Sequence, residues 1–259
     1  MARFPMRKLL FLIAGIAGAA ALTYRYAFLP WFRSWGVTPG ESARPLAGDE
    51  IIPSPNAGET RSILIDAPPA SVWPWLVQMG FGRAGWYSYD PIDMSGTSTR
   101  QILPEHQALA VGDLLPTHPG GGFVVRVIDP EKALVVYSDA AIVQAQAESF
   151  QTQLAAGEAE DSPVNLKATG ALMAGTQPVD FAASWAFVLE PAPGGGTKLI
   201  ERFRVRFGET DKPWTRYTLP VVGIGVFMMM RKQMLGIKER VEQAPRAIAT
   251  DSRVETVSS

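Results

Sequence analysis

Hydrophobic and polar residues alternate most clearly in two neighbouring segments of the chain. Every second residue is apolar from Val179 to Leu189, and the same period of two returns between Thr197 and Phe207. A period of two is typical of a strand with one buried face. A Pro-Gly-Gly-Gly sequence lies between the two segments and suits a turn. The pattern therefore predicts a β-hairpin.

The second strand of this hairpin carries an acid on its apolar face. Glu201 alternates in phase with Leu199 and Phe203. An inward carboxylate costs several kcal/mol unless it is paired or protonated. The preferred interpretation is a bulge or register shift that turns Glu201 outward; the alternative is a polar group inside a pocket, with Arg126 as its partner.

The opposite face of the same strand is basic. Its arginines are Arg202, Arg204 and Arg206. We expect them to form a solvated strand face, and contact with anionic lipid is the alternative.

Other segments predict further strands and two helices. Strands are expected at 60–66, 122–129 and 133–138. A helix is expected to begin at Ala67-Pro68-Pro69, to bend at Pro74 and to end at Gly80. Apolar residues spaced by three and four predict a long last helix, with the stripe Phe227, Met230, Met234, Ile237 and Val241.

This order of elements predicts an α+β fold, in which a curved antiparallel sheet wraps around the long C-terminal helix. The segment 140–178 lacks strand alternation and is interpreted as an insertion, helical near 142–154. The expected boundaries are 1–33 for a membrane segment, 34–58 for a linker arm, 59–242 for the folded domain and 243–259 for a disordered tail.

The N-terminal segment has the composition of a membrane anchor. Leu9 to Leu22 contains no charged residue, and aromatic residues follow up to Trp35. A spanning helix needs about 20 residues, which the run reaches if Arg25 extends toward the head groups. We therefore expect a single-pass membrane protein. The alternative is a signal peptide cleaved near Ala19-Ala20-Ala21, which would release a secreted protein.

Composition excludes several classes of function. The chain has 24 Lys and Arg against 25 Asp and Glu, so we expect no nucleic-acid partner. It has no cysteine and only two histidines, His106 and His118. We therefore expect no metal site, no cofactor and no catalytic residue that the sequence alone can assign.

Several motifs resemble a known family. They are Ala67-Pro68-Pro69, the run from Val72 to Gly80, the run from Arg83 to Asp90, and Trp185-Ala186-Phe187. Together they resemble actinobacterial members of the SRPBCC superfamily, which groups START lipid-transfer domains, plant allergen-type carriers and polyketide cyclases. The resemblance covers about residues 35–242 without the insertion. It implies a START-like helix-grip fold around an apolar pocket, without implying a reaction.

The resulting hypothesis is a membrane-anchored module that holds a hydrophobic small molecule or lipid. The residues expected to border its pocket are Trp86, Tyr87, Tyr89, Asp90, Trp185, Phe187, Met230 and Met234. A cyclase- or hydrolase-like enzyme on the same fold is the alternative, with Tyr87, Tyr89, Asp90 or His106 as acid and base. A third hypothesis is an interaction protein whose interior is filled by side chains.

Overall fold

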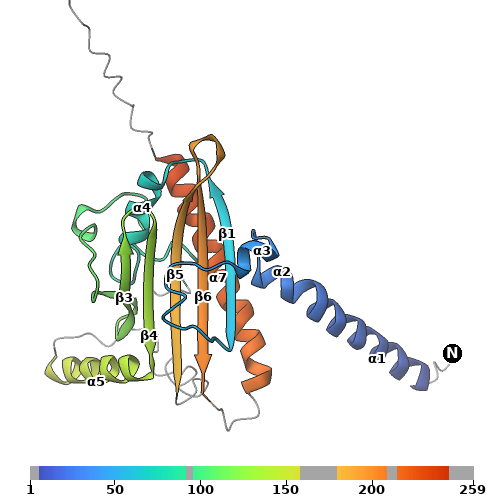
Figure 1. The fold of residues 1–259 in the computed structure, drawn as a ribbon. Helices are drawn as coiled ribbons and strands as arrows, with labels where there is room; N and C mark the ends of the chain where they lie inside the picture. Colours follow the sequence, from blue (N-terminus) through green and yellow to red (C-terminus); the bar gives the residue numbers. More distant parts are fainter. Residues whose placement is uncertain (1–5, 92–95, 158–179, 209–214, 245–259) are drawn as a thin grey trace, which may run out of the picture.

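The computed structural model describes residues 6–91, 96–157, 180–208 and 215–244 of the 259-residue chain. Its centre is a curved antiparallel sheet with the strand order β1-β6-β5-β4-β3-β2 (Figure 1). The strands are β1 (Ala57–Ile65), β2 (Leu114–His118), β3 (Gly121–Asp129), β4 (Ala133–Asp139), β5 (Phe181–Pro191) and β6 (Thr197–Phe207). The long helix α7 (Thr215–Gln243) lies against the concave face of the sheet. The predicted α+β, helix-grip architecture is confirmed.

The predicted hairpin is formed by β5 and β6. The two strands pair without interruption from Phe181 opposite Phe207 to Pro191 opposite Thr197. Their connection needs glycine, because Gly194 and Gly195 both have positive φ angles, of 77° and 82°. The alternation read from the sequence therefore gives the faces of both strands.

The main core lies on the concave face of the sheet. The predicted apolar stripe of α7 is buried there along its whole length, from Phe227 to Val241. The second helix on this face is α4 (Pro69–Val77), which contains Pro74 and buries Val72, Trp75 and Leu76. Burial of these two helix faces against the strands provides the main hydrophobic stabilisation.

The segment predicted as a linker arm, 34–58, packs against the outer face of the sheet. It includes the short helix α3 (Pro39–Ala43). Leu46 and Ile52 are buried, and Leu46 joins a second core cluster with Val135 and Ile200. Gly48 lies so close to the sheet that a Cβ there would approach Val135 to 2.5 Å. The sheet is therefore covered on both faces.

Two elements at the β2 end of the sheet show what local patterns detect. The helix α5 (Ala140–Ala156) matches the helix expected inside the insertion; it buries Phe150 and bonds Gln146 to the backbone of Gly122. Strand β2 is not among the predicted strands, and it contains Pro116. As an edge strand it tolerates proline, which lacks an N–H group for the ladder. The rest of the insertion, 158–179, and the tail from 245 onward lie outside the described residues.

The N-terminal segment is helical throughout, through α1 (Met6–Thr23), the π-helical turn η1 (Tyr24–Phe28) and α2 (Leu29–Arg33). Residues Leu10–Arg33 are long and apolar enough to cross a membrane, and a signal sequence would have the same properties. Figure 1 shows α1 pointing away from the sheet. At its end, Phe32 is buried and its ring lies 5.6 Å from that of Phe227 on α7. The helix is thus docked to the domain at its C-terminal end.

Candidate ligand-binding site

Three of the predicted pocket residues form one aromatic cluster on the concave face. The rings of Trp86 and Trp185 stack in parallel, with centroids 5.4 Å apart and an interplanar angle of 8°. The ring of Phe187 lies 4.8 Å from that of Trp185. Phe123 and Phe203 approach the same indole edge-on, at 6.0 and 6.2 Å. Trp185 is therefore the centre of an aromatic wall contributed by β3, β5 and β6.

Tyr87 has a structural role in the corner between Trp86 and Asp90. Its hydroxyl donates to the carbonyl of Trp75 at 3.2 Å and accepts from Nε2 of Gln78 at 2.8 Å. Burial raises the pKa of this hydroxyl. Its backbone is held at a φ of +58°, a region that costs energy for a residue other than glycine. The side chain therefore holds the chain in place instead of offering free polar groups.

Asp90 is engaged in the same corner. Its Oδ1 accepts a hydrogen bond of 2.6 Å from the hydroxyl of Ser98, and that hydroxyl in turn accepts from the backbone N–H of Tyr87. Tyr89 is half-buried beside them. Asp90 thus binds the loop on which it lies, and the enzyme alternative finds no unengaged carboxylate at this position.

The two predicted methionines lie on the buried stripe of α7. Met234 is fully buried in the core. The sulfur of Met230 lies 3.1 Å from Nη1 of Arg61, a residue of β1. This contact links the predicted site to the guanidinium group of Arg61, which is not among the predicted residues.

Arg61 is fully buried at the junction of β1, α2 and α7. Its Nε donates to the carbonyl of Phe32 at 2.9 Å, and its Nη2 forms an ion pair with Glu59. The guanidinium carbon lies 4.9 Å from the centre of the Phe227 ring. The signal for Arg61 was available in the sequence, because it alternates in phase with the inward residues Ile63 and Ile65.

Glu201 faces the interior, so the preferred expectation of a bulge was wrong. Strand β6 keeps its register on both sides, with Glu201 opposite Arg61 on β1 and Phe187 on β5. The residue is fully buried. The suggested partner Arg126 lies elsewhere, 5.2 Å from the ring of Tyr137.

The Glu201 carboxyl lacks hydrogen-bond partners. Among the described residues, neither of its oxygens accepts a hydrogen bond of ordinary length and angle, and the indole N–H of Trp185 interacts with the carboxyl only weakly. Burial raises the pKa of Glu201 to about 8, although the nearby Arg61 and Trp185 lower it. At neutral pH the carboxyl is therefore mostly protonated, and it offers one donor and one acceptor.

A third unpaired group comes from α7. Gln233 is buried and donates to the sulfur of Met79 at 3.4 Å, but its carbonyl oxygen has no partner among the described residues. Buried polar atoms without partners are rare in native proteins. The Glu201 carboxyl, the Trp185 N–H and the Gln233 carbonyl therefore have unused hydrogen-bonding capacity, as do Tyr24, Arg83 and Arg231 elsewhere among the described residues. Trp185 is one of the eight predicted pocket residues, and Glu201 is the polar group that the sequence analysis gave as the alternative to a bulge.

The two histidines lie in separate elements. His106 lies in the 3-10 turn η2 (Pro104–His106), and Nδ1 of His118 accepts from the backbone N–H of Gly120. No group of three or more acidic or histidine side chains in the described ranges is placed to hold a metal ion.

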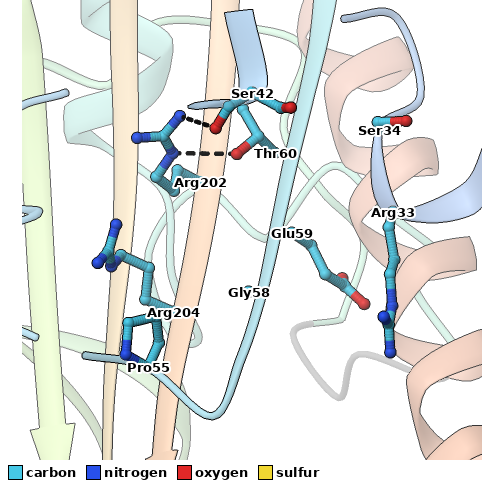
Figure 2. Close-up of a pocket in the computed structure, with 9 residues that line it drawn as sticks. All are labelled: Arg33, Ser34, Ser42, Pro55, Gly58, Glu59, Thr60, Arg202 and Arg204. Carbon is cyan, nitrogen blue, oxygen red and sulfur yellow. Dashed lines mark hydrogen bonds between the residues drawn. The ribbon is translucent and has the colours of Figure 1, made fainter. Parts of the chain in front are cut away.

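A hollow of about 270 Å³ lies at the edge strand β1 beside the N-terminal arm, and it is lined by none of the eight predicted residues (Figure 2).

No family model matches this chain, and no curated protein sequence matches it. Among solved structures, it is similar to protein MLL2253 from Mesorhizobium loti, at 14% identity over 73% of this chain and 99% of that chain, with a TM-score of 0.35. A protein from Arthrobacter aurescens is similar at 13% identity over 75% and 91% of the two chains, with a TM-score of 0.36.

A plant structure is also similar. It is At1g70830 from Arabidopsis thaliana, a member of the major latex protein family, at 14% identity over 69% and 94% of the two chains, with a TM-score of 0.30. Membership of the SRPBCC superfamily, including its actinobacterial branch, stays a prediction. Similarity at this level locates no ligand or catalytic residue in the present chain.

Proposed function

We propose that the chain is a membrane-held helix-grip module that binds an apolar molecule carrying one polar group. The ligand lies between the concave face of the sheet and α7, and its polar group bonds to Glu201 and Trp185. The observation that carries this proposal is that Glu201 and Trp185, two buried polar groups beside the aromatic wall, lack full hydrogen-bond partners among the described residues.

The energetics of burial support this assignment. A buried donor or acceptor without a partner costs about 1–3 kcal/mol. A ligand hydroxyl or carbonyl placed between Glu201 and Trp185 would remove that cost, while the aromatic wall around Trp185 would contact its apolar part. Ligand pockets are typically apolar with a few such polar groups.

The membrane part of the proposal rests on the N-terminal helix. Its apolar span ends at Arg33, and Trp31 and Phe32 contact Phe227 at ring distances of 5.3 and 5.6 Å. An anchor docked in this way would hold the domain close to the bilayer, where apolar ligands are concentrated. Carbonate extraction tests this part: the protein should stay in the membrane pellet, and a soluble chain that begins near Leu22 would contradict it.

The ligand part is tested by native mass spectrometry of the full chain purified in detergent. We expect a co-purified apolar molecule in the wild type and in Glu201→Gln, because an amide keeps both a donor and an acceptor. We expect about tenfold weaker retention in Glu201→Leu. The matched control is Glu190→Leu, which removes an acid that pairs with Arg44 at the periphery of the sheet. Equal retention in Glu201→Leu and the control would contradict the proposal.

A second candidate function is proton transfer by Glu201. The observation that favours it is the pKa of about 8, since a carboxyl poised near neutral pH suits an acid or a base. The same preparations separate the two functions. An enzyme should accumulate an unreacted molecule in Glu201→Gln that differs in mass from the molecule bound to the wild type, whereas a carrier should hold the same molecule in both.

A further inference from the structure

A hollow of about 270 Å³ lies outside the grip, where the N-terminal arm meets the edge strand β1. We call it the Gly58 hollow. Its lining includes Arg33, Gly58, Glu59, Thr60, Arg202 and Arg204. Figure 2 shows it crossing β1 at Gly58, with Arg202 and Arg204 on one side of the strand and Arg33 and Glu59 on the other. Arginine is thus the most frequent residue of the lining.

Two of these arginines keep N–H groups that no described residue accepts. Each guanidinium has five N–H donors. Arg202 uses four of these donors, in hydrogen bonds to Thr60, to Asp49 and to the carbonyls of Ser42 and Arg44. Arg204 uses three donors, in contacts with Asp49 and with the carbonyls of Ile52 and Pro53. One and two donors respectively are left.

Arg33 is the residue with most unused capacity. It is exposed at the end of α2, and no hydrogen bond or ion pair joins it to the part of the chain that the structure describes. The hydroxyl of Thr60 accepts from Arg202 and makes no donation of its own there. Donors from α2, β1 and β6 therefore line a single hollow.

The charge of the hollow is positive. Glu59 is its acid, and this carboxylate is already paired with the buried Arg61. Asp49 bridges Arg202 and Arg204 from behind at 2.6 and 2.9 Å, which offsets one of the three lining charges. About two positive charges are left without a counter-ion in the described structure. Guanidinium groups suit phosphate because they donate paired, charge-assisted hydrogen bonds.

The size and position of the hollow restrict the ligand further. Its volume lies just below the range of about 300–1,000 Å³ for small-molecule pockets, so it has room for a head group and not for acyl chains. Arg33 ends the candidate membrane span Leu10–Arg33. If that helix is inserted, as proposed above, the hollow lies at the level of the lipid head groups.

We infer that the Gly58 hollow binds a phosphate group, either the phosphodiester of an anionic lipid head group or a free phosphate. Arg33 supplies the principal contact, and Arg202 and Arg204 supply the remaining donors from across the edge strand. This site is distinct from the proposed ligand site, because it lies at the edge strand β1 and its lining includes none of Glu201, Trp185 and Gln233.

Two variants remove the site without touching the core. Arg33→Gln removes the exposed charge, and no described partner is lost. Gly58→Leu fills the hollow from its floor; a Cβ at Gly58 meets only the carbonyl oxygen of Phe203, at an ordinary 3.6 Å. The control is Arg206→Gln, which also removes one positive charge, from the strand that carries Arg202 and Arg204, but lies outside the hollow and is half exposed.

The experiment adds phosphatidylglycerol or phosphatidylcholine, at equal mole fractions, to the full chain in neutral detergent and counts retained lipids by native mass spectrometry. We expect preferential retention of phosphatidylglycerol, reduced about tenfold in Arg33→Gln and Gly58→Leu and unchanged in Arg206→Gln. Displacement by inorganic phosphate would show that the phosphate alone suffices; resistance to displacement would assign the site to the lipid head group.

Equal retention of the two lipids by the wild type would overturn the inference, and so would an equal loss in Arg33→Gln and Arg206→Gln. If circular dichroism shows that Gly58→Leu does not fold, Arg33→Gln decides the outcome. Isothermal titration with inorganic phosphate does not depend on the anchor or on the interior ligand. Failure of the proposed function therefore leaves this measurement interpretable.

Discussion

Strand β6 carries charged residues on both of its faces, and these residues differ in how many hydrogen-bond partners they have. On the outer face, Arg202 and Arg204 bond to carbonyl groups and Asp49 of the N-terminal arm. On the inner face, Glu201 has no hydrogen bond of ordinary length and angle from the described residues. Arg61, its neighbour on β1, draws its partners from α2, β1 and α7 instead.

The difference comes from what covers each face. The arm is irregular, so several of its backbone carbonyls are free of secondary structure and accept hydrogen bonds from arginines. Helix α7 covers the other face with an apolar stripe, and the carbonyls of a helix interior are already bonded within the helix. The inner face therefore offers few free backbone carbonyls, so a polar side chain there needs another side chain or a ligand as its partner.

The outer arginines also correct an expectation. They were expected to be solvated, but Arg202 and Arg204 are largely covered by the arm, and only Arg206 stays half exposed. The physical reason is the packing of residues 34–58, which covers most of these two side chains and bonds them to its carbonyl groups.

The largest expected effect is the loss of the inner cation. Arg61→Met should lower the free energy of unfolding by about 3–5 kcal/mol, because it leaves Glu59 and the carbonyl of Phe32 without their buried partner. Urea denaturation of the full chain in detergent measures it. Arg206→Met is the control and should change stability by less than about 1 kcal/mol. A similar loss of stability in both variants would contradict the claim that the inner arginine contributes more to stability than the outer one.

The next effect is a pH dependence caused by Glu201. Its pKa is about 8 in the folded protein against 4.5 in the unfolded chain, so between these values the folded state binds more protons. Stability due to this group is therefore greatest below pH 4.5 and falls as the pH rises through 8. Relative to Glu201→Gln, the wild type should lose a few kcal/mol across this range, at about 1.4 kcal/mol per pH unit. Parallel stability curves for the two proteins would show that the carboxyl is not buried in this way.

A smaller effect separates a ligand site from a filled core. Met234→Trp adds volume between α7 and the sheet. If the proposed site exists, the variant should keep its stability and lose the fluorescence of a bound apolar probe. A close-packed core should instead lose about 1–3 kcal/mol, in a protein whose wild type never bound the probe. Met228→Trp on the exposed side of α7 is the control and should change neither property.

The smallest effect concerns the attachment of α5. Gln146 bonds to both the N–H and the carbonyl of Gly122, at 3.0 and 3.3 Å. Gln146→Ala should cost about 1 kcal/mol, measured by thermal unfolding. Gln144→Ala, which breaks only an exposed contact with Glu148, should be close to neutral. A larger loss in Gln144→Ala would mean that the inward side of α5 is assigned incorrectly.

The sequence by itself determined the elements whose evidence is periodic. Alternation gave the faces of β5 and β6, and spacing by three and four gave the buried stripe of α7. These patterns are local, since one buried face repeats every two or every three to four residues. The same rule placed Glu201 correctly on the inner face; a general argument about the cost of buried charge then led to the wrong preference for a bulge.

Only the tertiary structure decided which groups become partners. Arg61 receives its surroundings from Phe32, 29 residues earlier, and from Met230, 169 residues later. The Gly58 hollow likewise combines Arg33 of α2 with Arg202 and Arg204 of β6. No local period reports such pairs, because they depend on where the arm and the helices meet the sheet. The composition of both candidate sites is therefore a property of the folded chain, although each of their residues could be seen in the sequence.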